Sequence, residues 1–370
     1  MGIGQLSMSK NVQIEITSIC NLKCKMCPKI TDKILSSGSP GPMSDRVWKS
    51  ILPFAKKAGA ICLIVYGEAL TDPDFISRIK EVDNLGIIST FSTNGILISK
   101  KIASELGSLQ YLSNINISID SPDPEVYRKV RGGNLESVWT GVKNLREHTK
   151  RITISSILMK STIGTLHEFP AILSRLGIKK WILSPLKTKS EDLIEEHLHF
   201  AKDVDKTMAR IIFEAKKEKI KLKLFQKDRT DLEISDSDMA KNSFLTTKNI
   251  PEGVTRDCIM PWAWPTVNKD GLVFPCCYIS DDAEAIMGDV NKKSLEDIWF
   301  GKRFEHFRKT ITLSEGNTMP ACCKACTQAP LTKRHSALPN RFGISPVLLK
   351  FNVEQYLRRI YGNLILRMRT

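Results

Sequence analysis

The chain has 370 residues and a formal net charge of +15, with 42% hydrophobic and 26% charged residues. This composition supplies an ordinary packed core and excludes a disordered chain. No segment has the run of about eighteen apolar residues that a membrane span needs, and residues 1–20 lack the hydrophobic stretch of a signal peptide. We therefore expect a globular protein in the cytoplasm.

The excess of Lys and Arg indicates an acidic partner, such as an anionic small molecule, a nucleic acid or an anionic membrane surface. A solvated face is the simpler explanation, because many of these residues are Lys on predicted helices and in the segment 216–227. Charge alone therefore does not identify the partner.

Apolar runs alternate with helical patterns from residue 13 to about residue 185, as parallel strands with helical crossovers require. Six βα units are too few to close an eight-stranded barrel, so the sequence predicts an α/β fold built on a partial (β/α)6 TIM-like barrel. The C-terminal ends of its strands should form the active face. The six predicted strands are Gln13–Thr17, Ala60–Tyr66, Gly86–Ser92, Asn114–Asp120, Ile152–Met159 and Lys180–Ser184.

Three further parts follow the predicted barrel core. Asn268–Gly271 separates two apolar runs and predicts a β-hairpin, since Gly accepts the positive φ of such a turn. The end of the chain has basic residues and apolar residues at helical spacing, which predicts an amphipathic helix that packs on the barrel or contacts a membrane surface. The predicted parts are the core at 1–190, a helix at 191–217 with a basic strand and a polar linker up to residue 257, a cysteine-rich domain at 258–330, and a basic amphipathic tail at 331–370.

Ten cysteines in a chain without a signal peptide should stay reduced, which favours metal or redox chemistry over disulfides. Cys20, Cys24 and Cys27 lie on one short loop directly after the first predicted strand. Three thiolates can bind three corners of an iron–sulfur cube and leave one iron open for a ligand. A zinc site completed by a distant residue, or a chance cluster of cysteines, is the alternative.

A second group of cysteines lies in the segment 258–326. Two pairs joined by a hairpin suit either a zinc site or an iron–sulfur cluster, and spacing alone does not separate the two. Cys277 and Cys322 are adjacent extra thiols, and Cys277 is a candidate hydrogen donor to a substrate radical as well as a candidate structural thiol. Cys62 stands alone in an apolar run and is expected to be buried and inert. The four predicted ligands are Cys258, Cys276, Cys323 and Cys326.

The first cysteine loop resembles the CxxxCxΦC motif of the radical S-adenosylmethionine (SAM) superfamily, with Met26 as the Φ residue. Tyr66–Gly67–Glu68 looks like the family's glycine-glutamate motif, which holds the amino group of SAM, although Tyr66 replaces the commoner glycine. Arg131 is similar to the residue that pairs with the SAM carboxylate. The resemblance also places four polar side chains of strand ends against the ribose and methionine moieties: Ser92, Asn94, Ser118 and Asp120.

The segment after residue 258 resembles the SPASM and twitch domains, which carry auxiliary iron–sulfur clusters. Pro261–Trp262, Gly288–Val290 and the helix pattern at Ser294–Trp299 also match these domains. The full SPASM set has seven cysteines, and no cysteine follows Cys326, so we expect one auxiliary cluster. The cofactors implied by the resemblance are SAM, one 4Fe–4S cluster in the core and one auxiliary 4Fe–4S cluster.

The resemblance implies that the reduced core cluster cleaves SAM and that the resulting 5′-deoxyadenosyl radical removes a hydrogen atom from the substrate. Our first hypothesis is oxidation or epimerisation of a small polar molecule, such as a sugar, a cyclitol or a nucleotide-linked compound, with a reductant such as flavodoxin or ferredoxin as partner. The alternative is maturation of a peptide or protein. We rank it second because the nineteen residues before Cys20 are too few for a fused peptide-recognition domain.

Two other functions rank lower. RNA modification would suit the positive charge, but the sequence has no appended RNA-binding motif with aromatic platforms, so nucleic acid is not an expected partner. A metal-stabilised scaffold or electron carrier without enzymatic activity is the remaining hypothesis.

Overall fold

The computed structural model describes most of the two predicted modules. Most of the predicted polar linker at 226–257, up to residue 253, and the predicted basic helix of the tail lie outside the described residues. Within the described part, no helix is long and apolar enough to cross a membrane. The described residues are 9, 11–31, 39–63, 66–186, 190–198, 203–224, 254–256, 258, 260–279, 283–313, 318–324, 326 and 331–333.

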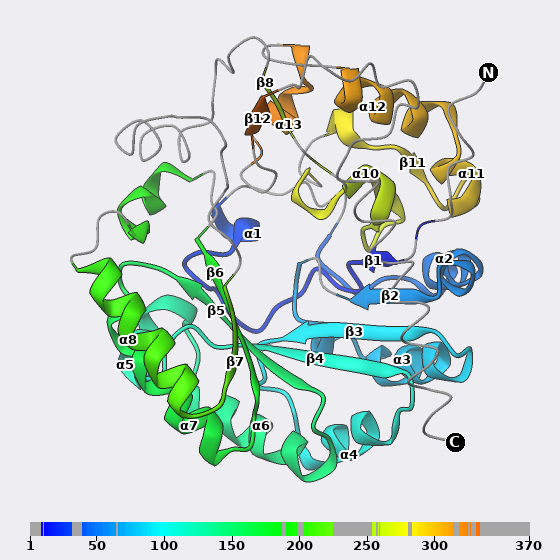
Figure 1. Ribbon diagram of the computed structural model, residues 1–370. Helices are drawn as coiled ribbons and strands as arrows, with labels where there is room; N and C mark the ends of the chain where they lie inside the picture. Colours follow the sequence, from blue (N-terminus) through cyan, green and yellow to red (C-terminus); the bar gives the residue numbers. More distant parts are fainter. Residues whose placement is uncertain are drawn as a thin grey trace, which may run out of the picture.

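A single ten-stranded sheet, with the order β11-β10-β9-β1-β2-β3-β4-β5-β6-β7, runs through both modules. The strands β1 to β7 pair in parallel, and Figure 1 shows that they curve into an open barrel. All six predicted strands are present, and the predicted basic strand adds β7 at the edge. These seven are β1 (Val12–Ile14), β2 (Ala60–Leu63), β3 (Ile88–Thr93), β4 (Leu112–Ser118), β5 (Ile152–Leu158), β6 (Lys180–Pro185) and β7 (Lys221–Leu224).

Helices cover the convex side of this sheet (Figure 1). The local sequence determines where several of these helices begin. Ser44 caps the helix that starts at Asp45 by accepting the Val47 N–H at 3.3 Å, and Asp123 caps the helix that starts at Pro124 by accepting the Val126 N–H at 2.8 Å. Short polar side chains at these positions satisfy N–H groups that a helix leaves unpaired. The covering helices are α2 (Asp45–Ala58), α3 (Phe75–Asn84), α4 (Lys100–Ser108), α5 (Pro124–Arg131), α6 (Leu135–His148), α7 (Phe169–Arg175) and α8 (Val204–Lys217).

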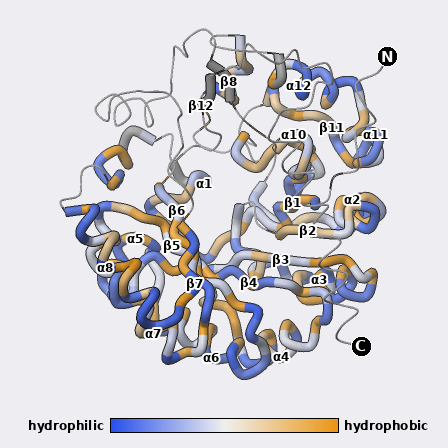
Figure 2. Tube along the Cα trace, viewed as in Figure 1, coloured by the Kyte–Doolittle hydropathy of each residue, from blue (hydrophilic) through white to orange (hydrophobic). Residues whose placement is uncertain are grey.

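The two faces of the sheet differ in polarity. Because side chains alternate along a strand, Phe91, Ile115 and Trp181 point to the helices and are fully buried. Their neighbours Ser92 and Asn116 point to the inner side and are half-buried. Figure 2 shows hydrophobic and hydrophilic residues in succession along the strands and helices. A polar inner face is unusual for a barrel of this kind, whose interior is normally packed with branched apolar side chains, and it leaves room for polar ligands.

The predicted single helix over 191–217 is wrong. The chain forms a short 3₁₀ helix, η3 (Glu191–Glu196), and only later the helix α8. His197 is extended, with ψ 145°, and Asp203 is left-handed, with φ 54°, so neither continues a right-handed helix. Two other 3₁₀ helices, η1 (Ala69–Thr71) and η2 (Ile163–Glu168), lie within the barrel.

The second module extends the sheet from β1. The predicted hairpin is confirmed: β9 and β10 are antiparallel, and Gly271 has a φ of +92°. The strands β8 and β12 pair outside this sheet, so the predicted linker up to residue 257 and the predicted tail from residue 331 each lose three residues to a strand. The elements are β8 (Val254–Arg256), α10 (Met260–Ala263), β9 (Thr266–Val267), β10 (Leu272–Phe274), η5 (Cys277–Ile279), η6 (Ala283–Ala285), β11 (Gly288–Asp289), α11 (Leu295–Trp299), α12 (Lys302–Leu313), α13 (Ala321–Lys324) and β12 (Leu331–Lys333).

Aromatic packing joins the second module to the barrel. Trp299 of α11 is fully buried, and its ring centroid lies 6.1 Å from that of Phe54 in α2 and 4.9 Å from that of Phe304 in α12. The Arg308 guanidinium carbon lies 4.1 Å from the Trp299 ring centroid, and the guanidinium donates to the Trp299 and Pro261 carbonyls. The two modules therefore share one hydrophobic core.

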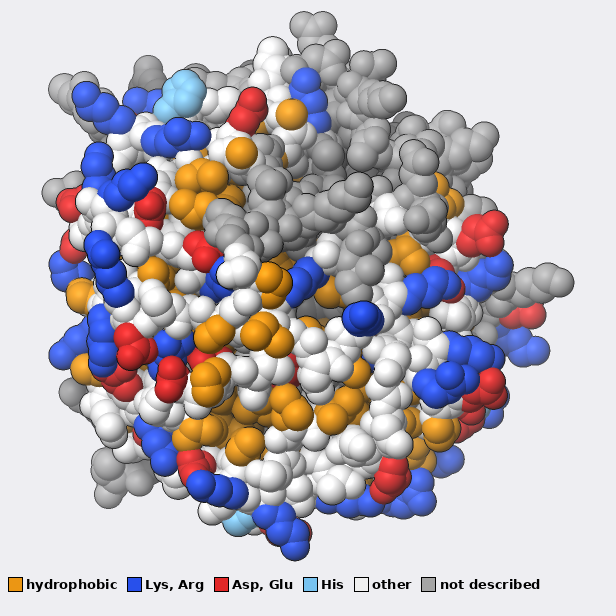
Figure 3. All heavy atoms as spheres, turned by 180° about the vertical axis from the view of Figure 1, so that it is seen from behind, with side chains coloured by type: hydrophobic (Ala, Val, Ile, Leu, Met, Phe, Trp, Pro, Cys, Tyr) orange, Lys and Arg blue, Asp and Glu red, His pale blue; other side chains and the backbone are white. Residues whose placement is uncertain are grey.

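Basic side chains are spread over the surface. Lys216, Lys217, Lys219, Lys221 and Lys223 are all exposed. Figure 3 shows Lys and Arg on the back of the molecule with Asp and Glu among them. This distribution agrees with the interpretation of the excess Lys residues as a solvated face.

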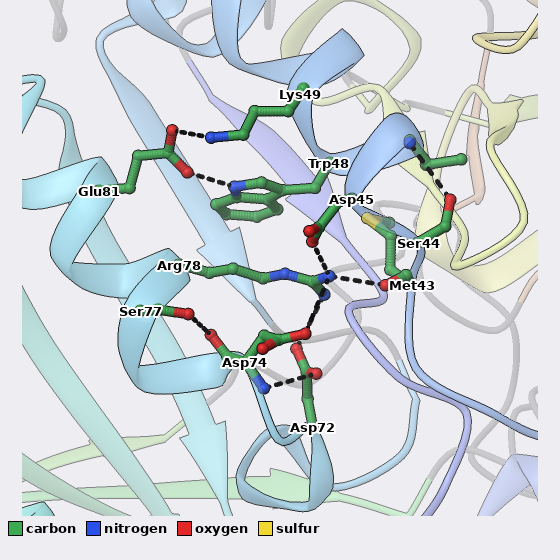
Figure 4. Close-up of polar contacts among 11 residues, drawn as sticks. Met43, Ser44, Asp45, Trp48, Lys49, Asp72, Asp74, Ser77, Arg78 and Glu81 are labelled. Atoms are coloured by element: carbon green, nitrogen blue, oxygen red, sulfur yellow. Dashed lines mark hydrogen bonds and ion pairs between the residues drawn. The ribbon is translucent and has the colours of Figure 1, made fainter.

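Arg78 of α3 is the centre of a buried polar cluster between α2 and α3 (Figure 4). Its guanidinium, which is 4% exposed, contacts the fully buried Asp72 carboxylate at 2.9 Å and the Asp45 carboxylate at 2.8 Å. It also donates to the Met43 carbonyl at 2.7 Å. Arg78 thus holds the start of α2 against the loop that precedes α3. The indole of Trp48 lies beside Arg78, with 5.7 Å between the guanidinium carbon and the ring centroid.

Replacing Arg78 by Ala would leave the Asp72 carboxylate buried without its cation. We expect the free energy of unfolding to fall by about 3–5 kcal/mol, the usual cost of removing one partner of a buried ion pair. Lys80→Ala is a matched control on the same helix, because Lys80 forms an exposed pair with Glu105 at 3.2 Å and should change stability by less than about 1 kcal/mol. Denaturant unfolding measures both, and equal losses would contradict the assignment.

Candidate active site

The first cysteine loop follows β1, at the C-terminal end of the parallel strands. Cys20, Cys24 and Cys27 are each half-buried. The Cys27 N–H donates to the Cys24 carbonyl at 3.1 Å, and the Lys25 N–H donates to the Val130 carbonyl at 2.8 Å. The loop is therefore folded on itself and tied to the end of α5.

The three thiols of this loop are near one another. Burial raises the pKa of Cys20 and raises that of Cys24 to about 11, and the charge of a Cys27 thiolate raises both further. Three thiolates in one partly buried place repel each other unless a cationic group lies between them. An iron–sulfur cluster, which binds each thiolate through a different iron, fits this arrangement.

Among the described residues, no group of three or more His, Cys, Asp or Glu side chains is close enough to hold one metal ion. The ligands of a cluster are more widely spaced than those of one ion, because the sulfides bridge the irons. The assignment of Cys20, Cys24 and Cys27 as cluster ligands stays a prediction from the sequence.

Gly67 packs directly against the start of the cysteine loop. Its φ is +82°, and a Cβ atom at this position would lie 2.2 Å from the Thr17 carbonyl oxygen and 2.9 Å from the Ile19 carbonyl oxygen. The next residue, Glu68, donates its backbone N–H to the Ile19 carbonyl at 2.8 Å. Only glycine permits this approach, so the predicted glycine-glutamate motif also positions the cysteine loop.

The Glu68 carboxylate is almost completely buried, with 2% of the residue exposed. It accepts the Thr93 hydroxyl and the Asn94 N–H, both at 2.7 Å, and burial raises its pKa. The Asn94 side chain continues to Asn21 of the cysteine loop, donating to its amide oxygen at 2.7 Å. The ends of β2 and β3 and the cysteine loop thus form one polar network. The sequence prediction missed Thr93 and Asn21.

The other predicted SAM contacts lie on the inner face or near the cysteine loop. Asn116 donates to the hydroxyls of Ser92 and Ser155 at 3.0 Å each, which links β3, β4 and β5. Among the described residues, the buried Asn116 Oδ1 has no hydrogen-bond partner. Ser118, two residues along β4, is half-buried on the same face. The polar side chains of this inner face suit a cofactor that contains a nucleoside.

Arg131 forms an ion pair with Asp120, and its predicted contact with the SAM carboxylate stays a prediction. The Arg131 Nε donates to Asp120 Oδ2 at 2.6 Å, and the Ile157 N–H donates to Asp120 Oδ1 at 2.8 Å. Burial lowers the pKa of Arg131, but the charge and hydrogen bond of Asp120, together with the charges of Cys24 and Tyr127, raise it above its usual value. Met26 lies nearby in an apolar cluster with Val130, and Cys24 packs against this cluster.

The predicted ligands of the second cluster are close together in space. Burial raises the pKa of Cys276 well above its usual value, and the charges of Cys258 and Cys326 raise it further. The pKa of Cys323 is raised by its hydrogen bond with Cys322, by burial and by Cys276 and Cys258. The pairing of β8 with β12 brings the two ends of this segment together. Each of these four thiols therefore lies near enough to another for their charges to interact, and their role as ligands of one cluster stays a prediction from the sequence.

Glu15 is a charged inner-face residue that the sequence prediction missed. It follows β1, whose other side chains Val12 and Ile14 are fully buried against the helices. The Lys269 N–H approaches its carboxylate at 3.5 Å. Burial raises the pKa of Glu15 to about 7, although the charges of Lys29 and Lys269 lower it. The sequence signal that could have identified Glu15 is a charged residue that alternates with the apolar residues of a strand.

Two sequence-family profiles match the chain. The Radical SAM superfamily matches residues 14–180, and the iron–sulfur cluster-binding domain SPASM matches residues 258–327. A probable GTP 3′,8-cyclase of Methanococcus aeolicus is 30% identical over 224 residues, which cover 56% of this chain and 72% of that protein. The chain belongs to the radical SAM superfamily.

Other relatives of this radical SAM protein have different activities. The mycofactocin maturase MftC of Mycobacterium tuberculosis is 29% identical over 168 residues, and the match covers 44% of this chain and 41% of the maturase. The structure of Streptococcus suis SuiB bound to its precursor peptide SuiA has a TM-score of 0.63 at 16% identity and covers 87% of this chain and 71% of SuiB. This likeness concerns the fold.

Membership defines the cofactors of this radical SAM protein. They are SAM and a 4Fe–4S cluster in the core, with an auxiliary iron–sulfur cluster in the SPASM domain. The two places where cysteines gather fit these two clusters.

Replacing Gly67 by Ala should displace the cysteine loop of this radical SAM protein, because the new Cβ would overlap the Thr17 carbonyl. We expect reconstituted protein to fall from about eight irons per chain to about four, those of the auxiliary cluster. In the control Gly164→Ala, the new Cβ meets nothing within 4 Å. Iron analysis after anaerobic reconstitution measures the change, and about eight irons in Gly67→Ala would contradict the expectation.

Glu15 should make stability depend on pH. Its pKa is raised from 4.5 to about 7 in the folded state, so the folded protein binds the proton more tightly than the unfolded chain. This contribution is complete below the unfolded pKa and is lost as the pH rises through about 7. Between about pH 5 and about pH 8 the parent protein should therefore lose more stability than Glu15→Gln. Identical pH profiles in denaturant unfolding would show that Glu15 has an ordinary pKa.

Proposed function

We propose that this radical SAM enzyme modifies a peptide or protein. The observation that carries the proposal is its relationship to the maturase MftC, at 29% identity over 168 residues, in a chain that also has a SPASM domain. SuiB, whose fold resembles this one, is described with a bound precursor peptide. These relatives reverse the order expected from the sequence, which placed oxidation or epimerisation of a small polar molecule first.

A nucleotide-linked substrate is the second candidate. The GTP 3′,8-cyclase relative supports it, because the match covers 72% of that protein. The net charge of +15 would also suit a phosphorylated substrate. This candidate keeps part of the original small-molecule hypothesis.

The residues of the barrel suit radical chemistry on either substrate. When bound, SAM and the reduced core cluster supply a 5′-deoxyadenosyl radical that removes a hydrogen atom from the substrate. Glu68, already held by Thr93 and Asn94, would hold the amino group of SAM. Because its carboxylate is fixed before SAM binds, little ordering is needed on binding.

The polar inner face supplies the remaining contacts. Ser92, Asn116 and Ser155 are linked across three strands, and this row of polar side chains would face the sugar or base of the cofactor. Arg131, neutralised by Asp120, would order the loop beneath the methionine moiety rather than serve as a free cation. We place the substrate against this inner face of the barrel.

The first test is SAM cleavage. Reconstituted protein should contain about eight irons and release 5′-deoxyadenosine after reduction. The combined replacement of Cys20, Cys24 and Cys27 by Ala should abolish cleavage and retain about four irons. Cleavage by this variant would refute the assignment of the core cluster.

The second test identifies the substrate class. Candidate peptides deuterated at Cα or Cβ, and candidate nucleotides deuterated on the ribose, are incubated separately with the enzyme and SAM. Mass spectrometry then measures deuterium in 5′-deoxyadenosine. Transfer from a peptide carbon supports the maturase, whereas transfer from the nucleotide alone overturns it in favour of the second candidate.

A further inference from the structure

Tyr66 contacts the auxiliary module from within the SAM-binding motif. Its hydroxyl donates to the backbone carbonyl of Cys277 at 3.0 Å, across 211 positions of the sequence. Tyr66 stands two residues before Glu68, and Cys277 directly follows the predicted cluster ligand Cys276. One hydrogen bond therefore joins the two predicted cofactor sites.

The surrounding contacts hold the same loop. The Gln13 side chain of β1 hydrogen-bonds the Cys277 thiol, and Cys62 of β2 is close enough for its charge to act on that thiol. Gln13 is itself held by the Thr266 hydroxyl of β9 at 3.1 Å, and Cys62 by the Thr90 hydroxyl at 3.0 Å. The loop carrying Cys276 and Cys277 thus rests on the inner side of β1 and β2.

We propose that Tyr66 is a positioning residue that fixes the Cys276–Cys277 loop, and with it the auxiliary cluster, against the SAM-binding end of β2. The glycine usual at this position in the family has no side chain that could make the contact. The substitution that departs from the family motif therefore has a structural role in this chain. The proposal depends on Cys276 as a cluster ligand and not on the peptide substrate.

The contact should influence the auxiliary cluster through its electrostatic environment. The Tyr66 O–H dipole offsets the negative end of the Cys277 carbonyl dipole next to the cluster. Without the hydroxyl, that carbonyl disfavours an added electron and the loop is held less tightly. Hydrogen bonding and burial around a cluster are the main means by which a protein sets its reduction potential.

The experiment uses the full chain with Cys20, Cys24 and Cys27 replaced by Ala, so that only the auxiliary cluster remains. Tyr66→Phe is added to this background, since Phe keeps the ring and removes only the hydroxyl. Iron content is measured first, followed by an EPR-monitored redox titration. We expect about four irons, a lower midpoint potential and changed g-values in Tyr66→Phe.

Tyr111→Phe is the matched control, because Tyr111 lies on the outside of the barrel and is 38% exposed. It should leave the potential unchanged. An unchanged or raised potential in Tyr66→Phe overturns the proposal. Tyr66→Gly, which restores the family residue, should lower the potential at least as much as Phe does, and a parental potential in that variant also refutes the positioning role. Because no substrate is added, these results are independent of the peptide assignment.

Discussion

The structure depends on β1, a strand of three residues that is paired on both sides. Val12 and Gln13 pair with β2, while Gln13 and Ile14 pair with β9 of the SPASM domain. The same strand leads into the cysteine loop. Because a central strand is fixed by two ladders of hydrogen bonds, the core cluster loop and the auxiliary module start from one rigid element. The relative position of the two cofactor sites follows from this pairing.

Buried polar contacts connect the cysteine loop to the face that is predicted to bind SAM. Arg78 binds the Met43 carbonyl and the Asp72 carboxylate. Backbone hydrogen bonds then connect these two regions to the segment that leads into the cysteine loop. Met43 donates its N–H to the Ile16 carbonyl, and Glu68 donates to the Ile19 carbonyl. Buried charges and amides are costly unless they are satisfied, so each contact also specifies one arrangement of the loop. The Thr93–Glu68–Asn94 network extends the same control to β3.

Many features of this fold were predictable because they depend on local sequence. The six strands of the core alternate or run apolar over their own length, and the hairpin at Gly271 needs only its own turn residues. Cysteine spacing and strand-end motifs indicated the superfamily. The prediction of one helix over 191–217 was wrong because apolar periodicity does not reveal the non-helical backbone at His197 and Asp203. The pairing of β8 with β12 joins segments 75 residues or more apart in sequence, which no local pattern reports.

The sequence by itself determined the residue chemistry: three thiols on one loop, six more in the segment 258–326, and polar side chains at strand ends. Only the tertiary structure decided how these residues are engaged. It pairs Arg131 with Asp120, makes Gly67 a support of the cysteine loop, and connects Tyr66 to Cys277. These outcomes depend on contacts between strands and modules that are distant in sequence. A pattern of residue types specifies which groups are available, whereas packing decides which partner each group meets.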